Sequence, residues 1–173
     1  MATKILTLIL FSLLLLPGLR AQDNLPTLSA IQYQIQTDSV SRTSSPQDIT
    51  VTVSAGSVND LSDLILGIDE VSAFWTVVSA NLNDQTLWLI NSPAPSEKQN
   101  VLAWRFDQEE NSLYLYPRDD QLSSDLTLIV RLNLLRPNRI ASQSSTTINM
   151  LADVGNVRYQ CVTTGSGNTI SFR

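Results

Sequence analysis

The sequence predicts an all-β protein folded as an antiparallel β-sandwich of about ten strands, with at most one short helix. Three observations predict it. Apolar and polar residues alternate in several segments, other segments are apolar at both parities, and turn-forming residues separate the segments at intervals of roughly 8 to 15 residues. Alternation with a period of two buries one face of a strand, and many short strands separated by turns are typical of a sandwich.

The segment LTLIVRLNL shows the alternation most clearly. Leucine or valine occupies every second position from Leu126 to Leu134, and Ile129 is the one apolar residue between them. The segment therefore predicts a strand with one face in the core, in which Leu132 is buried and Arg131 is exposed.

Similar patterns predict the other strands. Alternation indicates strands at residues 31–35, 49–53, 113–115 and 148–154. Segments that are apolar at both parities are predicted to be the more central strands: 73–80, 85–92 and 101–107. Residues 58–72 fit either a helix capped by Asn59 or Asp60, or a strand at LILGI, and the sequence leaves both open.

The end of the chain, RYQCVTTGSGNTISFR, combines a lone cysteine with a glycine-rich turn. GSGN, residues 165–168, is predicted to turn a final hairpin rather than bind phosphate, because a strand and not a helix follows it. Cys161 has the parity of Val157 and Tyr159, which predicts a buried and reduced thiol. It is the only cysteine of the chain, so no internal disulfide can form.

The start of the chain predicts export. Lys4 precedes an unbroken apolar run over residues 5–16, which is shorter than the roughly 20 residues of a membrane-spanning helix. Residues 1–21 are therefore predicted to be a secretory signal peptide, followed by a single domain at 22–173. We expect this domain in the periplasm or outside the cell, with no membrane insertion of the mature chain.

Composition restricts the chemistry. The chain has no histidine, which excludes the usual Ser-His and Cys-His nucleophile pairs and the common imidazole-ligated zinc sites. Without Lys4 and Arg20 the predicted mature chain carries nine basic and sixteen acidic residues, a charge of −7 that disfavours nucleic acid as a partner. The sequence therefore predicts a protein that is not an enzyme and needs no cofactor.

One acidic turn is a weak candidate for calcium. Asp107, Glu109 and Asn111 place side-chain oxygens at alternate positions, as in half of a calcium-binding loop. The segment lacks the central glycine and the distant bidentate glutamate of an EF-hand, and acids that flank strands are usually only solvated. The favoured prediction is therefore that no metal binds.

Aromatic residues supply the candidate binding site. Tyr114 and Tyr116 have the parity opposite to Leu113 and Leu115, so they are predicted to lie on an outer face, where rings stack on sugars or anchor proteins. Trp104 is their candidate neighbour. The alternative is that the tyrosines cover a second sheet or an edge. The tryptophans are expected in the core: Trp75, Trp88 and Trp104.

In its pattern of short strands, acidic composition and missing catalytic motifs, the chain resembles secreted bacterial immunoglobulin-like or cohesin-like modules. The resemblance implies a sandwich fold and carries over no functional residues. Two functions are predicted from different classes. The first is a non-catalytic interaction protein that serves in adhesion, as a scaffold or as a surface-assembly subunit, with a protein partner. The second is a carbohydrate-binding module that uses exposed aromatic residues to bind a glycan.

Overall fold

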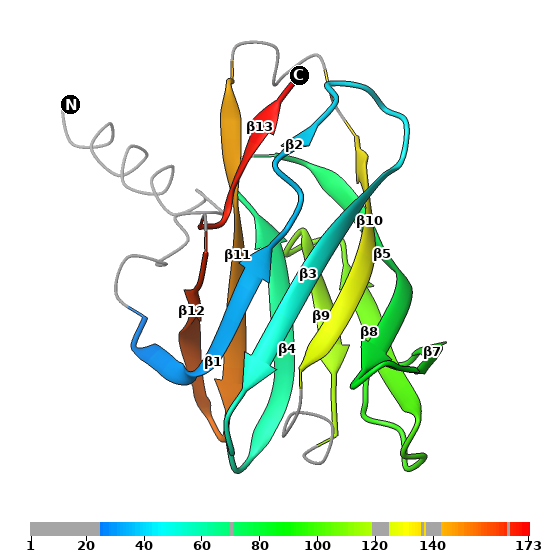
Figure 1. Ribbon diagram of the computed structural model, residues 1–173, viewed down its shortest axis with the longest axis vertical. Helices are drawn as coiled ribbons and strands as arrows, with labels where there is room; N and C mark the ends of the chain where they lie inside the picture. Colours follow the sequence, from blue (N-terminus) through cyan, green and yellow to red (C-terminus); the bar gives the residue numbers. More distant parts are fainter. Residues whose placement is uncertain (1–24, 70, 119–124, 136, 138–142, 166) are drawn as a thin grey trace, which may run out of the picture.

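The computed structural model describes residues 25–69, 71–118, 125–135, 137, 143–165 and 167–173. These residues form 13 strands and no α-helix (Figure 1), which confirms the predicted all-β sandwich. The segment left open between helix and strand contains β4 (Leu61–Ile68), so its strand interpretation is right. Within the described ranges, no helix is long and apolar enough to cross a membrane. The predicted signal peptide lies outside the described residues.

Two layers of strands make up the sandwich. The front sheet, nearest the viewer in Figure 1, pairs its strands antiparallel in this order: β5 (Ala73–Leu82), β10 (Leu126–Leu134), β3 (Gln47–Ala55) and β1 (Thr27–Ile35). The back sheet likewise pairs antiparallel in this order: β12 (Val157–Thr163), β11 (Ser145–Val154), β4, β9 (Ser112–Tyr116) and β8 (Val101–Asp107). We call the outer surfaces of these sheets the front face and the back face.

The two sheets are joined at both margins. At one margin β1 pairs in parallel with β12, with a register shift between Leu28 and Gln32. At the other, β6 (Gln85–Thr86) pairs with β5, and β7 (Trp88–Asn91) pairs in parallel with β8. The chain therefore passes from the front sheet, at β6, to the back sheet, at β7, within a few residues. Two further strands pair at one end of the sandwich: β2 (Ser39–Val40) and β13 (Thr169–Phe172).

The core lies between the sheets and follows the alternation of the sequence. On β10, Leu132 and the other apolar residues of its parity are buried, whereas Arg131 is exposed and pairs with Asp48 on β3. Trp75 and Tyr33 are the largest fully buried side chains. The predicted orientation of this strand is confirmed.

The segments that are apolar at both parities are not the central strands. They form β5, β6, β7 and β8, which end the strand order at both sides. Phe74 of β5 and Phe106 of β8 explain the pattern, because their rings meet edge to face with centroids 4.8 Å apart. At this margin apolar side chains contact one another across the gap between the sheets, and some of them stay partly exposed, among them Phe74.

The predicted final hairpin is also wrong. Both β12 and β13 pair antiparallel with the same strand, β11. The chain therefore keeps its direction through the glycine-rich segment between them. Gly165 and Gly167 have φ values of +73° and +93°, which a glycine adopts without strain. Asn168 holds the start of β13 in place, since its Nδ2 donates to the Tyr33 hydroxyl at 3.2 Å and to Asn149 Oδ1 at 2.9 Å. The reversal of the chain falls instead between β11 and β12, at Gly155.

Cys161 is buried and free, as predicted, and burial raises the pKa of its thiol to about 12. The parity argument behind the prediction holds only in part, because Val157 is 45% exposed. Val157 lies at the end of β12 beside the turn, outside the part of the strand that pairs with β1.

Candidate interaction face

A second apolar cluster lies on the back face. Tyr114 and Tyr116 extend from β9 opposite to the main core and pack with Ile65 of β4 and Ala103 of β8, beside Leu151 of β11. The tyrosine rings are stacked, with centroids 6.4 Å apart and planes 19° apart.

The predicted parity of the two tyrosines is right, and their predicted exposure is wrong. Tyr114 is 6% exposed and Tyr116 is 7% exposed. The reason is that long polar side chains from neighbouring strands and from one turn fold over the rings. Neither ring has a free surface large enough to stack on a sugar.

Arg105 of β8 supplies one part of this cover. Its Cζ lies 5.0 Å from the centroid of the Tyr114 ring, within the range of a cation–π contact. Its Nη1 donates to Asp107 Oδ2 at 3.0 Å, and its Nε donates to the Tyr116 hydroxyl at 3.4 Å. The guanidinium is thus held in place on its own sheet while its side chain stays 40% exposed.

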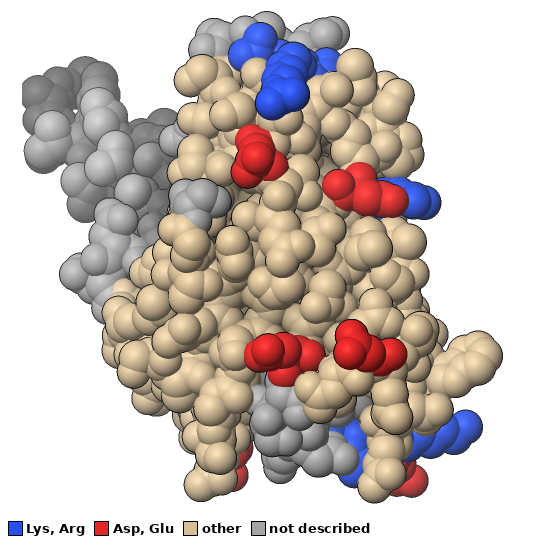
Figure 2. Space-filling model, viewed as in Figure 1, with Lys and Arg blue, Asp and Glu red and all other residues tan. Residues whose placement is uncertain are grey.

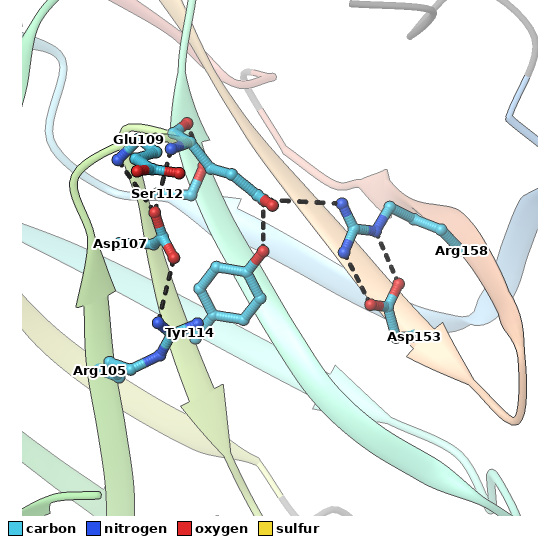
Figure 3. A network of polar contacts seen from close by, with 8 residues as sticks. Arg105, Asp107, Glu109, Ser112, Tyr114, Asp153 and Arg158 are labelled. Atoms are coloured by element: carbon cyan, nitrogen blue, oxygen red, sulfur yellow. Dashed lines mark hydrogen bonds and ion pairs between the residues drawn. The ribbon is translucent and has the colours of Figure 1, made fainter. Parts of the chain in front are cut away.

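Arg158 of β12 supplies the other part (Figure 3). It donates through Nε and Nη2 to the two carboxylate oxygens of Asp153, both at 2.8 Å, in a bidentate pair. Its Nη1 lies 3.8 Å from Glu110 Oε2, and Glu110 in turn accepts a hydrogen bond from the Tyr114 hydroxyl. Burial and the Glu110 carboxylate both raise the pKa of Tyr114. Tyr114 therefore acts as a neutral donor at physiological pH.

Asp63 of β4 is a partly buried carboxyl group beside this network. It lies directly across from Asp153, and its Oδ1 is buried and has no hydrogen-bond partner. Burial first, and the Asp153 carboxylate second, raise the pKa of Asp63 to about 6, while Arg158 acts in the opposite direction. The back face thus contains a carboxyl group that gains a proton in mild acid.

The weak calcium candidate forms a structural turn. Asp107 Oδ1 accepts hydrogen bonds from the backbone N–H groups of Glu109 at 2.9 Å and Glu110 at 3.1 Å. These bonds, aided by Arg105, hold the pKa of Asp107 below its ordinary value. Asn111 Oδ1 accepts from the Ala73 N–H at 3.0 Å. Both carboxylate oxygens of Asp107 and the side-chain oxygen of Asn111 are thus engaged in hydrogen bonds. No set of three metal-ligating side chains gathers among the described residues.

The tryptophans lie apart from the tyrosines. Trp104 is half-buried and packs against the main core, so it is no neighbour of the tyrosine cluster. Trp75 is buried in the core, as predicted. Trp88 is 70% exposed on β7, which contradicts its expected place in the core. The reason is its position on the last strand of the sheet, where only one side is paired.

Sequence reasoning missed most residues of the network. Asp63 and Asp153 are about 90 positions apart and meet only through the pairing of β4 with β11. The sequence does contain a signal for one pair of the network, Asp153 with Arg158. The Gly155–Asn156 dipeptide is a typical two-residue hairpin loop, and such a loop makes Asp153 and Arg158 cross-strand neighbours.

No protein-family model matches the sequence, and no curated protein matches it. Solved structures are similar in fold at low sequence identity. The N-terminal domain of a Streptococcus gordonii adhesin has a TM-score of 0.51 and 10% identity, over 83% of this chain and 32% of the adhesin chain. The present chain thus spans about a third of that chain.

Two further structures are more distant. A type I cohesin from a cohesin–dockerin complex of Clostridium thermocellum has a TM-score of 0.44 and 10% identity, over 87% of this chain and 98% of that one. The human F-spondin reeler domain has a TM-score of 0.45 and 8% identity, over 86% and 92% of the two chains.

Proposed function

We propose that this chain is an exported, non-catalytic interaction module that binds a protein partner through its back face. The observation that carries the proposal is the pair of partly exposed arginines, Arg105 and Arg158, held over the buried Tyr114 and Tyr116. Arginine and tyrosine are enriched among the residues that dominate binding energy at protein interfaces.

The network favours binding because it is ordered before a partner arrives. Asp107 holds the guanidinium of Arg105, and Asp153 holds that of Arg158. A partner therefore meets arginines that lose little conformational entropy on binding. Their unused donors and the neighbouring Glu110 present both signs of charge within a short distance, which favours a partner with a matching pattern of acidic and basic groups.

Export and an adhesive or scaffolding role complete the proposal. Export rests on the predicted signal peptide at residues 1–21. An adhesin domain with this fold provides a precedent for adhesion on such a scaffold. The carbohydrate-binding alternative loses its motivation, because the rings of Tyr114 and Tyr116 are buried.

The test compares arginines on the two outer faces. The exported protein and its variants are immobilised, and the envelope or surface proteins of the source cells are passed over them. We expect one partner to bind the wild type and to be lost from the Arg105→Ala/Arg158→Ala double variant.

Arg131→Ala is the matched control, because Arg131 also forms a bidentate pair with a carboxylate, Asp48, but on the front face. This control should bind the partner as the wild type does. Equal binding by all three proteins would refute the back face as the docking site. Glycans bound on an array, together with no bound protein, would favour the carbohydrate-binding function instead.

A further inference from the structure

Exposed apolar side chains concentrate at one margin of the sandwich. Among the described residues, six large hydrophobic side chains are exposed, and four of them lie on β5 and β7: Phe74, Val78, Trp88 and Ile90. Trp88 is the most exposed of the six at 70%. A concentration of this kind indicates an interaction site, whereas single exposed apolar residues are normal.

The backbone of β7 has one free side at this margin. The N–H groups of Trp88 and Ser92 donate to carbonyls on the β8 side, Asn100 at 2.8 Å and Trp104 at 3.0 Å. Because successive residues of a strand alternate in direction, the N–H and C=O groups of Leu89 and Asn91 point away from β8. Within the described part of the chain, no strand pairs with β7 on that side.

The free edge is short, at four residues, and lacks the other usual protections against pairing. Natural edge strands carry charged residues, prolines or bulges that prevent another strand from adding to them. Residues 85–96 contain no charged residue, and the first proline is Pro93, beyond the end of β7. The edge from Trp88 to Asn91 is therefore open to an added strand.

We propose that β7 pairs with β7 of a second copy of this chain, antiparallel about a two-fold axis at Ile90. In this register Leu89 of each copy lies opposite Asn91 of the other, and the two residues exchange the backbone hydrogen bonds that β8 leaves free. Ile90 meets Ile90 of the second copy, and Trp88 of each copy lies diagonal to that pair.

The strand suits such a partner for two reasons. Trp88 and Ile90 share a parity and Leu89 packs toward the core, so a two-fold axis at Ile90 gathers the exposed apolar side chains of both copies on one side of the joined sheet. The absence of charge from residues 85–96 keeps like charges out of the strand contact, although each copy is acidic overall. The site adjoins the back face, because Ile90 pairs with Ala103 of the tyrosine cluster. It involves neither Arg105 nor Arg158, so it does not depend on the function proposed there.

Sedimentation equilibrium of the full exported chain tests the proposal. Because association follows mass action, the weight-average mass should rise from one chain to two over about a hundredfold range of concentration. Ile90→Lys adds a charge to the edge and should keep the protein monomeric over the whole range.

Val157→Lys is the matched control, since Val157 is exposed to a similar degree, 45% against 39%, but lies on β12. It should associate as the wild type does. A wild type that stays monomeric, an Ile90→Lys variant that still associates, or a Val157→Lys variant that dissociates equally would each overturn the proposal.

A cross-link tests the register. Residues opposite each other at a non-hydrogen-bonded position have Cα atoms about 4.5 Å apart, within disulfide range. Ile90→Cys should therefore form a disulfide-linked dimer under mild oxidation, and Val157→Cys should not. The native Cys161 does not compete, because it is buried and burial raises its pKa to about 12. Failure of Ile90→Cys to cross-link under conditions where the wild type associates would overturn this register.

Discussion

The two outer faces of the sandwich follow the same alternation and differ in what covers them. On the front face, short hydroxyl side chains such as Thr52 and Thr127 lie opposite each other and stay partly exposed. The middle of the side formed by β1, β3 and β10 shows little charge, and acidic groups lie above and below this middle (Figure 2). On the back face, Tyr114 and Tyr116 have the same outward orientation and are nevertheless buried.

This difference teaches that side-chain length decides burial on an outer face. A threonine is too short to cover its neighbours, whereas Arg105 and Arg158 bring long aliphatic stems that lie over apolar groups and keep their charged ends in water. The back face thereby gains a second small core, and the front face does not.

The largest loss of stability is expected in the main core, which both sheets cover. Leu132→Asp would place a carboxylate between the sheets, at a residue with no exposed surface. We expect a loss of several kcal/mol in the free energy of unfolding and little soluble protein, measured as yield and by chemical denaturation. Arg131→Gln, one position away on the front face, should fold normally. Similar denaturation midpoints for the two variants would refute the assigned orientation of β10.

The next effect separates the two faces directly. Tyr114→Ala should lower the free energy of unfolding by about 3 kcal/mol, because it opens a cavity in the second core. Thr127→Ala on the front face should cost less than about 0.5 kcal/mol. Thermal and urea unfolding of both variants measure the difference. An unchanged melting temperature for Tyr114→Ala would mean that the ring is exposed, as the sequence predicted.

The two faces also differ in the environment of their arginine–aspartate pairs. Asp153, the partner of Arg158, is less exposed than Asp48, the partner of Arg131. In addition, Arg158 covers the tyrosine cluster. We expect Arg158→Ala to cost about 1 kcal/mol of folding free energy, after allowance for solvent screening, and Arg131→Ala to change it little. Double-mutant cycles with Asp153→Ala and Asp48→Ala measure the two pair energies, and equal values would contradict the distinction.

The last effect is confined to part of the pH range. The folded-state pKa of Asp63 is about 6, above its ordinary value of 3.8, so the folded state binds more protons between these values and loses stability as the pH rises through that window. Asp63→Asn removes this loss. The variant should be more stable than the wild type by about 1 kcal/mol at pH 7 and equally stable below pH 4.

Asp48→Asn is the control of opposite sign, because a hydrogen bond from Arg131 lowers the pKa of Asp48. This variant should lose stability at neutral pH, and the loss should disappear as the pH falls through the lowered pKa. Thermal melts across the pH range measure both differences. A difference for Asp63→Asn that does not change with pH would show that its pKa is not raised.

Much of the fold was predictable because alternation is a local property. The strands at Leu126–Leu134, the parity of Tyr114 and the burial of Cys161 all came from reading every second residue. The candidate site was predictable only as an orientation. Its polar cover, above all Asp63 and Arg158, comes from strands that the tyrosine strand meets only after folding.

The sequence by itself determined an all-β chain with one apolar face on most strands, because the backbone of a strand turns successive side chains to opposite sides wherever the strand lies. Only the tertiary structure decided that Tyr114 is buried and Trp88 exposed, since burial depends on which strands lie alongside. The tertiary structure also decided that the chain keeps its direction from β12 to β13, since both strands pair with β11. The raised pKa of Asp63 arises in the same way, from a carboxylate that β11 places opposite it.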